Sequence, residues 1–131
     1  MNHKNVLSEL QQLLGSKGYS DDPVDLAPWL TDWRGRFTGK AAAMLSPANR
    51  GELSALVKIA SKHRLALVPQ GGNTGMVGGA TPDAEGAACI VSLRRMNDIG
   101  TIDPDSGMVT CGAGVILQNL HDAVAKSGRR F

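Results

Sequence analysis

The sequence predicts an α+β fold: a small βαβ lobe with parallel strands, followed by the start of a second, antiparallel lobe. Two short apolar runs, at residues 40–46 and 65–68, flank a segment with helical periodicity, which is the pattern of a parallel strand–helix–strand unit. A third apolar run follows at residues 88–93. Beyond it, "DPDSG" at residues 103–107 is turn chemistry between two further strand-like segments.

The remaining elements follow in chain order. Apolar residues at helical spacing predict a helix at residues 4–17, whereas residues 21–39 contain two prolines and no period, so we expect a loop with at most a short helical turn. Asn49 and Glu52 form a capping box that begins the helix between the first two strands. A last amphipathic helix at residues 116–124 is expected to stop before Gly128.

Composition limits the possible classes of protein. The 131 residues are 42% apolar, which is enough for a packed core, and the formal net charge of +2 is too small to predict nucleic-acid binding. No apolar run is long enough to cross a bilayer, and the first residues do not have the pattern of a signal peptide. We therefore expect a cytoplasmic protein with Cys89 and Cys111 reduced in apolar surroundings, although an organelle interior fits the same features.

The most informative stretch is "VPQGGNTGMVGGATPD", residues 68–83. It follows a buried strand directly, and in open α/β sheets ligands bind at the carboxyl ends of the strands. Glycine lets backbone amides converge on an anion, because positive φ costs it little and no Cβ blocks the approach. A phosphate or pyrophosphate is the expected guest, and a branched side chain at Gly72 is expected to clash and to be strained at positive φ.

Two common phosphate loops do not match this stretch. The P-loop needs a lysine, and no Lys or Arg lies between Arg64 and Arg94. The dinucleotide fingerprint needs a different glycine spacing and a helix that begins at once, whereas "GGATPD" cannot begin an amphipathic helix. No helix amino terminus is therefore expected at the end of the loop. On composition alone, a flexible surface loop stays open as an alternative.

The sequence "VPQGGNTGMVGGATP" resembles the pyrophosphate-binding loop of FAD-linked oxidases of the vanillyl-alcohol-oxidase, or p-cresol-methylhydroxylase-type (PCMH-type), fold. Within that superfamily it is most similar to the D-2-hydroxyglutarate and D-lactate dehydrogenase group, which also includes glycolate oxidase. The segments "DWRGRFTGKAAAMLSPANRGELSALVKIASKHRLALVPQGGNTG" and "VSLRRMNDIGTIDPDSGMVTCGAGVILQNLHDAV" follow the order of the same family. The resemblance thus covers nearly the whole chain.

The resemblance implies a flavoprotein oxidoreductase that oxidises a D-2-hydroxy acid by hydride transfer to FAD. It divides the chain into an N-terminal helix and loop (1–39), a first FAD-binding lobe (40–93) with the pyrophosphate loop at 69–80, and the start of a second FAD-binding lobe (94–131). As an N-terminal fragment without the substrate domain, the chain is expected to be inactive and to self-associate through apolar surface. A non-catalytic nucleotide- or phosphate-binding module is the alternative.

The resemblance also assigns the cofactor-binding residues. Many relatives attach FAD covalently through a histidine in a Gly-Gly-His context, and here Asn73 takes that position, so we expect FAD to be held non-covalently. The candidate cofactor-binding residues are Pro69, Gln70, Gly71, Gly72, Asn73, Thr74, Gly75, Met76, Gly78 and Gly79.

Other polar residues are given structural interpretations. The three histidines, His3, His63 and His121, lack the spacing of a metal site, and no catalytic residue is expected in this chain. The arginines of "RGR" at residues 34–36 are interpreted as a solvated loop, and Arg94 and Arg95 as surface charge.

Overall fold

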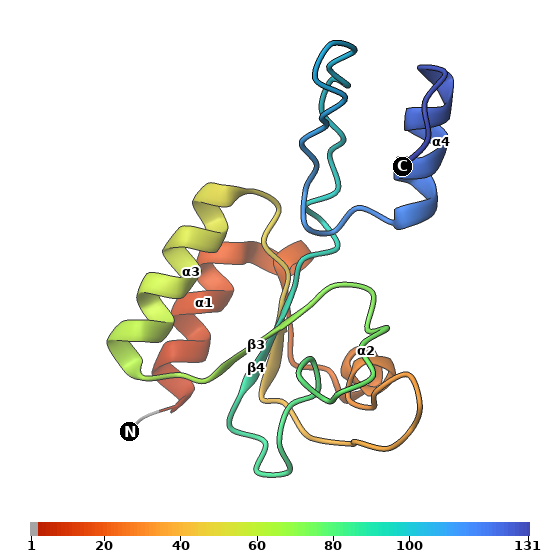
Figure 1. Cartoon of the computed structure of the whole chain (residues 1–131). Helices are drawn as coiled ribbons and strands as arrows, with labels where there is room; N and C mark the ends of the chain where they lie inside the picture. The colour runs from red at the N-terminus through yellow and green to blue at the C-terminus, as the bar shows by residue number, and fades with distance from the viewer. Residues whose placement is uncertain (1–2) are drawn as a thin grey trace.

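A computed structural model describes residues 3–131 (Figure 1). A four-stranded sheet lies at its centre in the order β1-β2-β4-β3, with β1 antiparallel to β2 and the other neighbours parallel. The strands are β1 (Tyr19–Ser20), β2 (Ala43–Leu45), β3 (Leu67–Gln70) and β4 (Cys89–Ser92). The helices are α1 (His3–Gly18), α2 (Pro23–Leu26), the 3-10 turn η1 (Ala27–Trp29), α3 (Arg50–His63) and α4 (Leu117–Lys126).

The predicted α+β fold is confirmed, with one difference in strand order. β2, α3 and β3 follow one another as predicted, and β2 and β3 are parallel to the same neighbour. They do not pair with each other, because β4 lies between them. The two-residue strand β1 was not predicted, since it exists only through its pairing with β2.

The helices begin and end where local chemistry predicts. Asn49 caps α3 by accepting a hydrogen bond from the amide of Glu52 at 2.9 Å, and the Glu52 carboxylate accepts one from the amide of Ala48 at 2.7 Å. The predicted loop at 21–39 holds only the short α2 and η1. α1 has a non-helical residue at Gly15, near the predicted end of the helix.

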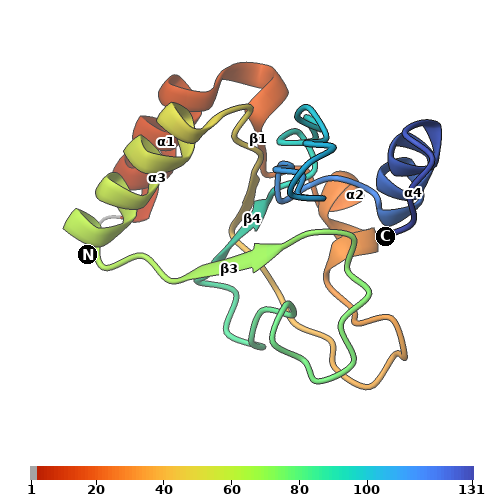
Figure 2. The same cartoon turned by 45° about the horizontal axis from the view of Figure 1, so that its top comes forward.

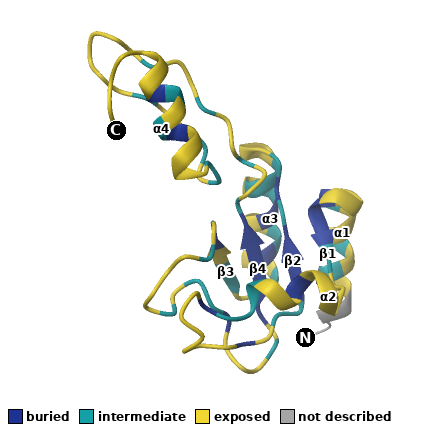
Figure 3. Cartoon of the chain, turned by 90° about the vertical axis from the view of Figure 1, so that its right-hand side faces the viewer, coloured by how far each residue is buried: buried dark blue, intermediate teal, exposed yellow. Residues whose placement is uncertain are grey.

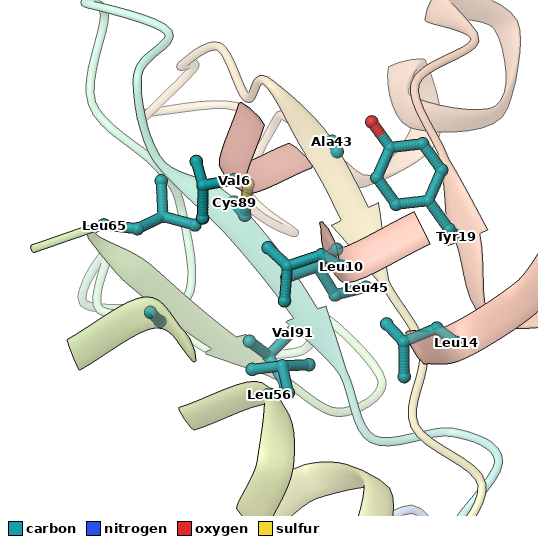
Figure 4. Packing of buried hydrophobic residues seen from close by; sticks show 11 residues of the cluster. Val6, Leu10, Leu14, Tyr19, Ala43, Leu45, Leu56, Leu65, Cys89 and Val91 are labelled. Carbon is teal, nitrogen blue, oxygen red and sulfur yellow. The ribbon is translucent and has the colours of Figure 1, made fainter. Parts of the chain in front are cut away.

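The core lies between the sheet and the pair formed by α1 and α3, which run side by side on one face (Figures 1 and 2). Leu10, Leu45 and Leu56 are completely buried there (Figure 4). Burial of each such side chain contributes about 1.5–3 kcal/mol. Met44 and Ile90 point to the opposite face, where they pack with Leu26. The sheet is therefore covered by long helices on one face and by α2 and η1 on the other.

Residues 94–131 extend away from the sheet and are largely exposed (Figure 3). The predicted antiparallel pair is present as a hairpin, in which Gly100 donates to the carbonyl of Thr110 and Asp103 to that of Met108. These bonds are too irregular to form strands in this part of the described chain, where Ile99 and Cys111 form an isolated β-bridge. Within residues 3–131, we find no helix with the length and apolar character needed to span a bilayer.

Candidate functional site

A cavity of about 650 Å³ lies between the glycine loop and the amino end of α4. This volume is in the range of small-molecule and cofactor sites. The loop contributes Gly72 and Thr74, and the opposite wall consists of residues 113–119, which lead into α4 and form its first turn. Trp29, Arg94 and Asn97 complete the lining. Segments from the first and second parts of the chain therefore meet at one site.

At four glycines of the loop, neither packing within the protein nor backbone conformation requires a residue without a side chain. A Cβ at Gly75 or Gly79 would meet nothing within 4 Å in the described chain. At Gly72 it would only approach the Thr74 methyl group at 3.9 Å, and at Gly71 the Ala113 carbonyl at 4.0 Å. None of the four has a positive φ. The open space beside this backbone can therefore hold a group from outside the chain. Backbone amides without neighbouring side chains are suited to binding a phosphate.

The expectation of a positive φ at Gly72 is wrong. The loop residues in the left-handed region are Asn73, with φ 56°, and Gly78, with φ 79°. Asn tolerates this conformation better than most residues. The ring of Phe37 lies against Gly78, where an added Cβ would come within 3.1 Å of a ring atom. Gly78 is thus required by both conformation and packing.

Gln70 and Asn73 direct their side chains into the protein. Gln70 is 2% exposed, and its Nε2 lies within hydrogen-bonding distance of the carbonyls of Trp29 (3.0 Å) and Ala80 (2.9 Å) and of the Asn73 Oδ1 (3.3 Å). Asn73 Nδ2 donates to the carbonyl of Thr31 at 2.8 Å. These side chains therefore hold the loop against residues 29–31.

The Gln70 Oε1 is buried and has no hydrogen-bond partner among the described residues. An unsatisfied buried polar atom costs about 1–3 kcal/mol. The donor contacts of Gln70 therefore offset this cost in the folded protein.

The other predicted residues differ in their position. Thr74 lines the cavity. Pro69 is exposed on β3, an edge strand, where the missing amide hydrogen of proline is tolerated. Met76 is half exposed, at 52%, and lies outside the lining of the cavity. Direct contact of each predicted residue with a cofactor stays a prediction.

The opposite wall was not predicted. Ile116 precedes α4, and no side-chain cap bonds to the first turn of this helix in the described structure. Leu117, Gln118 and Asn119, the first three residues of α4, line the cavity. A helix amino terminus attracts anions through its free amides and dipole. A helix amino terminus therefore lies across the cavity from the glycine loop, although none begins at the end of the loop itself. The signal for it in the sequence was "GAGV" followed by an amphipathic helix that lacks a capping residue.

Arg94 is more than the surface charge that the sequence suggested. Its guanidinium lies 3.7 Å from the centre of the Trp29 ring, and its Nε donates to Ser92 Oγ at 3.0 Å. This places a fixed positive charge in the lining of the cavity. Arg95 bonds to the carbonyl of Ser46 at 2.7 Å.

The remaining titratable groups lie apart from the cavity. Cys89 is buried, and burial raises the pKa of its thiol to about 11. Cys111 is exposed, contrary to the expectation of apolar surroundings. His63 bonds to Glu9 at 3.2 Å and the ring of His121 packs near Phe131, whereas the side chain of His3 lies outside the described residues. The described residues form no group of His, Cys, Asp and Glu that could hold a metal.

Comparison with known sequences shows the family to which the chain belongs. A family model described as "FAD binding domain" matches residues 41–131. A mitochondrial D-2-hydroxyglutarate dehydrogenase of Arabidopsis thaliana is 40% identical over 87% of this chain and 20% of the relative. A D-2-hydroxyglutarate dehydrogenase of Xanthomonas citri is 32% identical over 98% of this chain and 26% of the relative. A protein of Schizosaccharomyces pombe named as a mitochondrial D-lactate dehydrogenase is 36% identical over 98% of this chain and 24% of the relative.

Solved structures show the same fold. An alkyldihydroxyacetonephosphate synthase matches 98% of this chain and 26% of its own, with a TM-score of 0.84 and 20% identity. A p-cresol methylhydroxylase matches 95% and 25%, with a TM-score of 0.81 and 22% identity. The PCMH-type fold expected from the sequence is confirmed.

The named relatives also bear on the length of the chain and on the expected cellular location. The chain spans only 20–26% of the length of the named sequence relatives. The expected cytoplasmic location is wrong, because the relatives from S. pombe, Oryza sativa and A. thaliana are named as mitochondrial proteins.

Proposed function

The chain belongs to the FAD binding domain family, and from this membership we propose that it is the FAD-binding part of a dehydrogenase that oxidises a D-2-hydroxy acid. The names of the relatives support D-2-hydroxyglutarate or D-lactate as the substrate, and the sequence resemblance adds glycolate. In such an enzyme FAD supplies the hydride acceptor. The residues of this chain bind and orient the cofactor.

The observation that carries this proposal is the set of glycines whose Cβ positions are open. Gly71, Gly72, Gly75 and Gly79 leave backbone amides accessible where packing does not require glycine. We assign the FAD pyrophosphate to the amides of residues 71–75 and 78–79, with Thr74 beside it. The amino end of α4 faces this loop across the cavity and adds a second group of amide donors.

Replacement of Gly72 by valine tests this assignment. The new side chain meets open space in the protein, so the thermal unfolding midpoint is expected to stay close to that of the wild type. FAD affinity is expected to fall by about tenfold or more, because the branched carbon atoms occupy the space of the phosphate. Ala66→Val, on the exposed stretch before β3, is the control for an added branched side chain. Unchanged flavin content in Gly72→Val, measured in the full-length enzyme, would falsify the loop assignment.

We also propose that FAD is held without a covalent bond. Both polar atoms of the Asn73 side chain are hydrogen-bonded within the protein, and an amide is not a nucleophile. Cys89 is buried with a raised pKa, and Cys111 lies beside a different cavity, at the start of α3. Acid precipitation of the full-length enzyme is expected to release all flavin into the supernatant. Flavin that stays on a peptide from residues 3–131 contradicts this proposal.

A non-catalytic module that binds a nucleotide or phosphate is the second candidate. The apolar side chains of Val115, Ile116 and Leu117 in the cavity favour a ligand with large ring systems over a bare phosphate. The two candidate functions predict different orders of ligand affinity. We expect FAD to bind more tightly than ADP, and ADP more tightly than pyrophosphate, whereas equal affinities for all three support the phosphate module.

The same arrangement supports the proposed division at residues 40–93 and 94–131. Each part contributes one wall of the cavity. α1, which lies before residue 40, packs in the core of the first lobe. Since the chain contains no proposed catalytic residue, we expect it to have no dehydrogenase activity by itself.

A further inference from the structure

We propose that Gln70 is a positioning residue that fixes the shape of the cofactor loop before any ligand binds. This inference rests on the proposed function only in taking the loop to be the FAD site. It reassigns Gln70 from a group that contacts the cofactor to one that acts through the loop backbone.

The partners of Gln70 come from three segments. The Trp29 carbonyl belongs to η1, the Asn73 Oδ1 to the beginning of the loop and the Ala80 carbonyl to its end. A single amide group therefore joins both ends of the loop to each other and to a segment 41 residues earlier in the chain. Asn73 extends the same connection to the Thr31 carbonyl.

The chemistry of the partners requires an amide at this position. All three partners are acceptors, so the group facing them must donate, and a side-chain NH2 offers two hydrogens. The oxygen on the same side chain is left without a partner in the described structure, so the side-chain hydrogen bonds that hold Gln70 here are all made by its NH2 group. A carboxylate of the same size has no hydrogen to donate and repels the carbonyls.

These hydrogen bonds reduce the conformational entropy that the loop loses when a ligand binds. The loop glycines have few contacts of their own and would otherwise sample many conformations. With both ends fixed through Gln70, the amides converge in advance. The loop can thus be both bare enough to accept a phosphate and ordered enough to bind it.

The test is Gln70→Glu, with Gln11→Glu on the exposed face of α1 as the matched control. Limited proteolysis of the 131-residue chain without FAD, with a protease of broad specificity, is the primary measurement. Cleavage within residues 71–80 is expected to become about tenfold or more faster in Gln70→Glu at about pH 8, so that the loop loses its protection, while α1 and α3 stay protected. Unchanged loop protection overturns the proposal.

A pH profile distinguishes positioning from general destabilisation. The introduced carboxyl is buried among carbonyls, so its pKa is raised and it becomes protonated as the pH falls to about 5.5, when it again donates one hydrogen bond. Protection of the loop against cleavage is expected to recover partly in this variant and not to change in the control. Arg94, over the Trp29 ring, and Asp32, next to Thr31, are charged groups on the adjoining segments. The pKa of Asp32 is lowered by the amides that bond to it, so this carboxylate stays ionised in this range. Absence of recovery overturns the proposal.

FAD titration separates this inference from the proposed function. Lower affinity together with lower loop protection supports both. Lower affinity with full loop protection means that Gln70 contacts FAD directly and overturns the inference alone. Lower protection with unchanged affinity supports positioning but overturns the loop as the FAD site. If Gln70→Glu does not fold, Asn73→Gly removes the bond to Thr31 without strain at positive φ, and it is expected to lower loop protection to a smaller extent.

Discussion

One carboxylate holds the loop between Thr31 and Gly39 in shape. Asp32 is 5% exposed and accepts hydrogen bonds from the amides of Phe37 at 2.8 Å, Arg36 at 2.6 Å and Arg34 at 3.3 Å. These bonds, the Phe37 amide first, hold the pKa of Asp32 below its ordinary value. Asn73 and Phe37 connect the glycine loop to this region, so we expect the protonation of Asp32 to affect the position of that loop.

The lowered pKa predicts a loss of stability in acid. A carboxyl group with a lower pKa in the folded state stabilises the fold above its unfolded pKa of about 3.9, and this contribution is lost as the pH falls through the folded value. Asp32→Asn is therefore expected to be less stable than the wild type at about pH 7, with the difference shrinking below about pH 4. Thermal unfolding from neutral to acid pH measures this, with Asp98→Asn as the exposed control. A constant difference across that range contradicts the assignment.

At this scale the sequence predicted the loop but not the orientation of its side chains. The glycines and their place after β3 were evident from spacing alone. That Gln70 and Asn73 point inward depends on carbonyls 41 and 42 residues away, which no local pattern contains. The positive φ that was predicted for Gly72 occurs at Asn73 instead. This too depends on distant residues, because the Asn73 side chain bonds to the carbonyl of Thr31.

At the scale of elements, helices were predicted better than strands. α1, α3 and α4 each have apolar residues at helical spacing and recognisable ends. β1 and the hairpin of residues 99–111 depend on their partners, so their length could not be read from the sequence. The position of α4 opposite the glycine loop is also a tertiary feature that no local pattern predicts, because almost 40 residues separate the two segments in the sequence.

Because the start of α4 has no capping side chain, a capping residue added there is expected to stabilise the helix and to weaken the binding of FAD. Ile116 occupies the capping position without bonding to the first turn in the described structure. Ile116→Asp is expected to stabilise α4 by about 0.5–1 kcal/mol. The new carboxylate occupies the amides and repels an anion, so FAD affinity is expected to fall by about tenfold.

Urea unfolding and flavin titration of this variant test the two effects separately. Ile116→Asn, which caps the helix without adding a full charge, is the matched comparison and is expected to lose less affinity. Equal or higher FAD affinity in Ile116→Asp contradicts a role of α4 in phosphate binding.

At the scale of the whole molecule, exposed apolar side chains gather on two adjacent loops. Val77 is 88% exposed and Trp33 68% exposed, and the contact between Phe37 and Gly78 brings their loops together. Isolated apolar residues are common on surfaces, but a contiguous patch favours association.

We therefore expect the 131-residue chain to self-associate as its concentration rises. Sedimentation velocity over a wide concentration range measures this. Replacement of Val77 and Trp33 by serine is expected to shift the distribution towards monomer, and Ala84→Ser is the exposed control. A single monomeric species at every concentration contradicts the expectation.

The central position of β4 determines when the sheet can assemble during synthesis. β2 and β3 are made first, yet neither has the other as a neighbour, and each pairs in parallel only with β4. Until residues 89–92 have left the ribosome, β3 has no strand to pair with and β2 has only the two-residue β1. Pairing over such long sequence separations is slow, because the intervening loops must close before the contacts form. We therefore expect β3, which leads into the glycine loop, to lack a neighbouring strand in the nascent chain until β4 is inserted between β2 and β3.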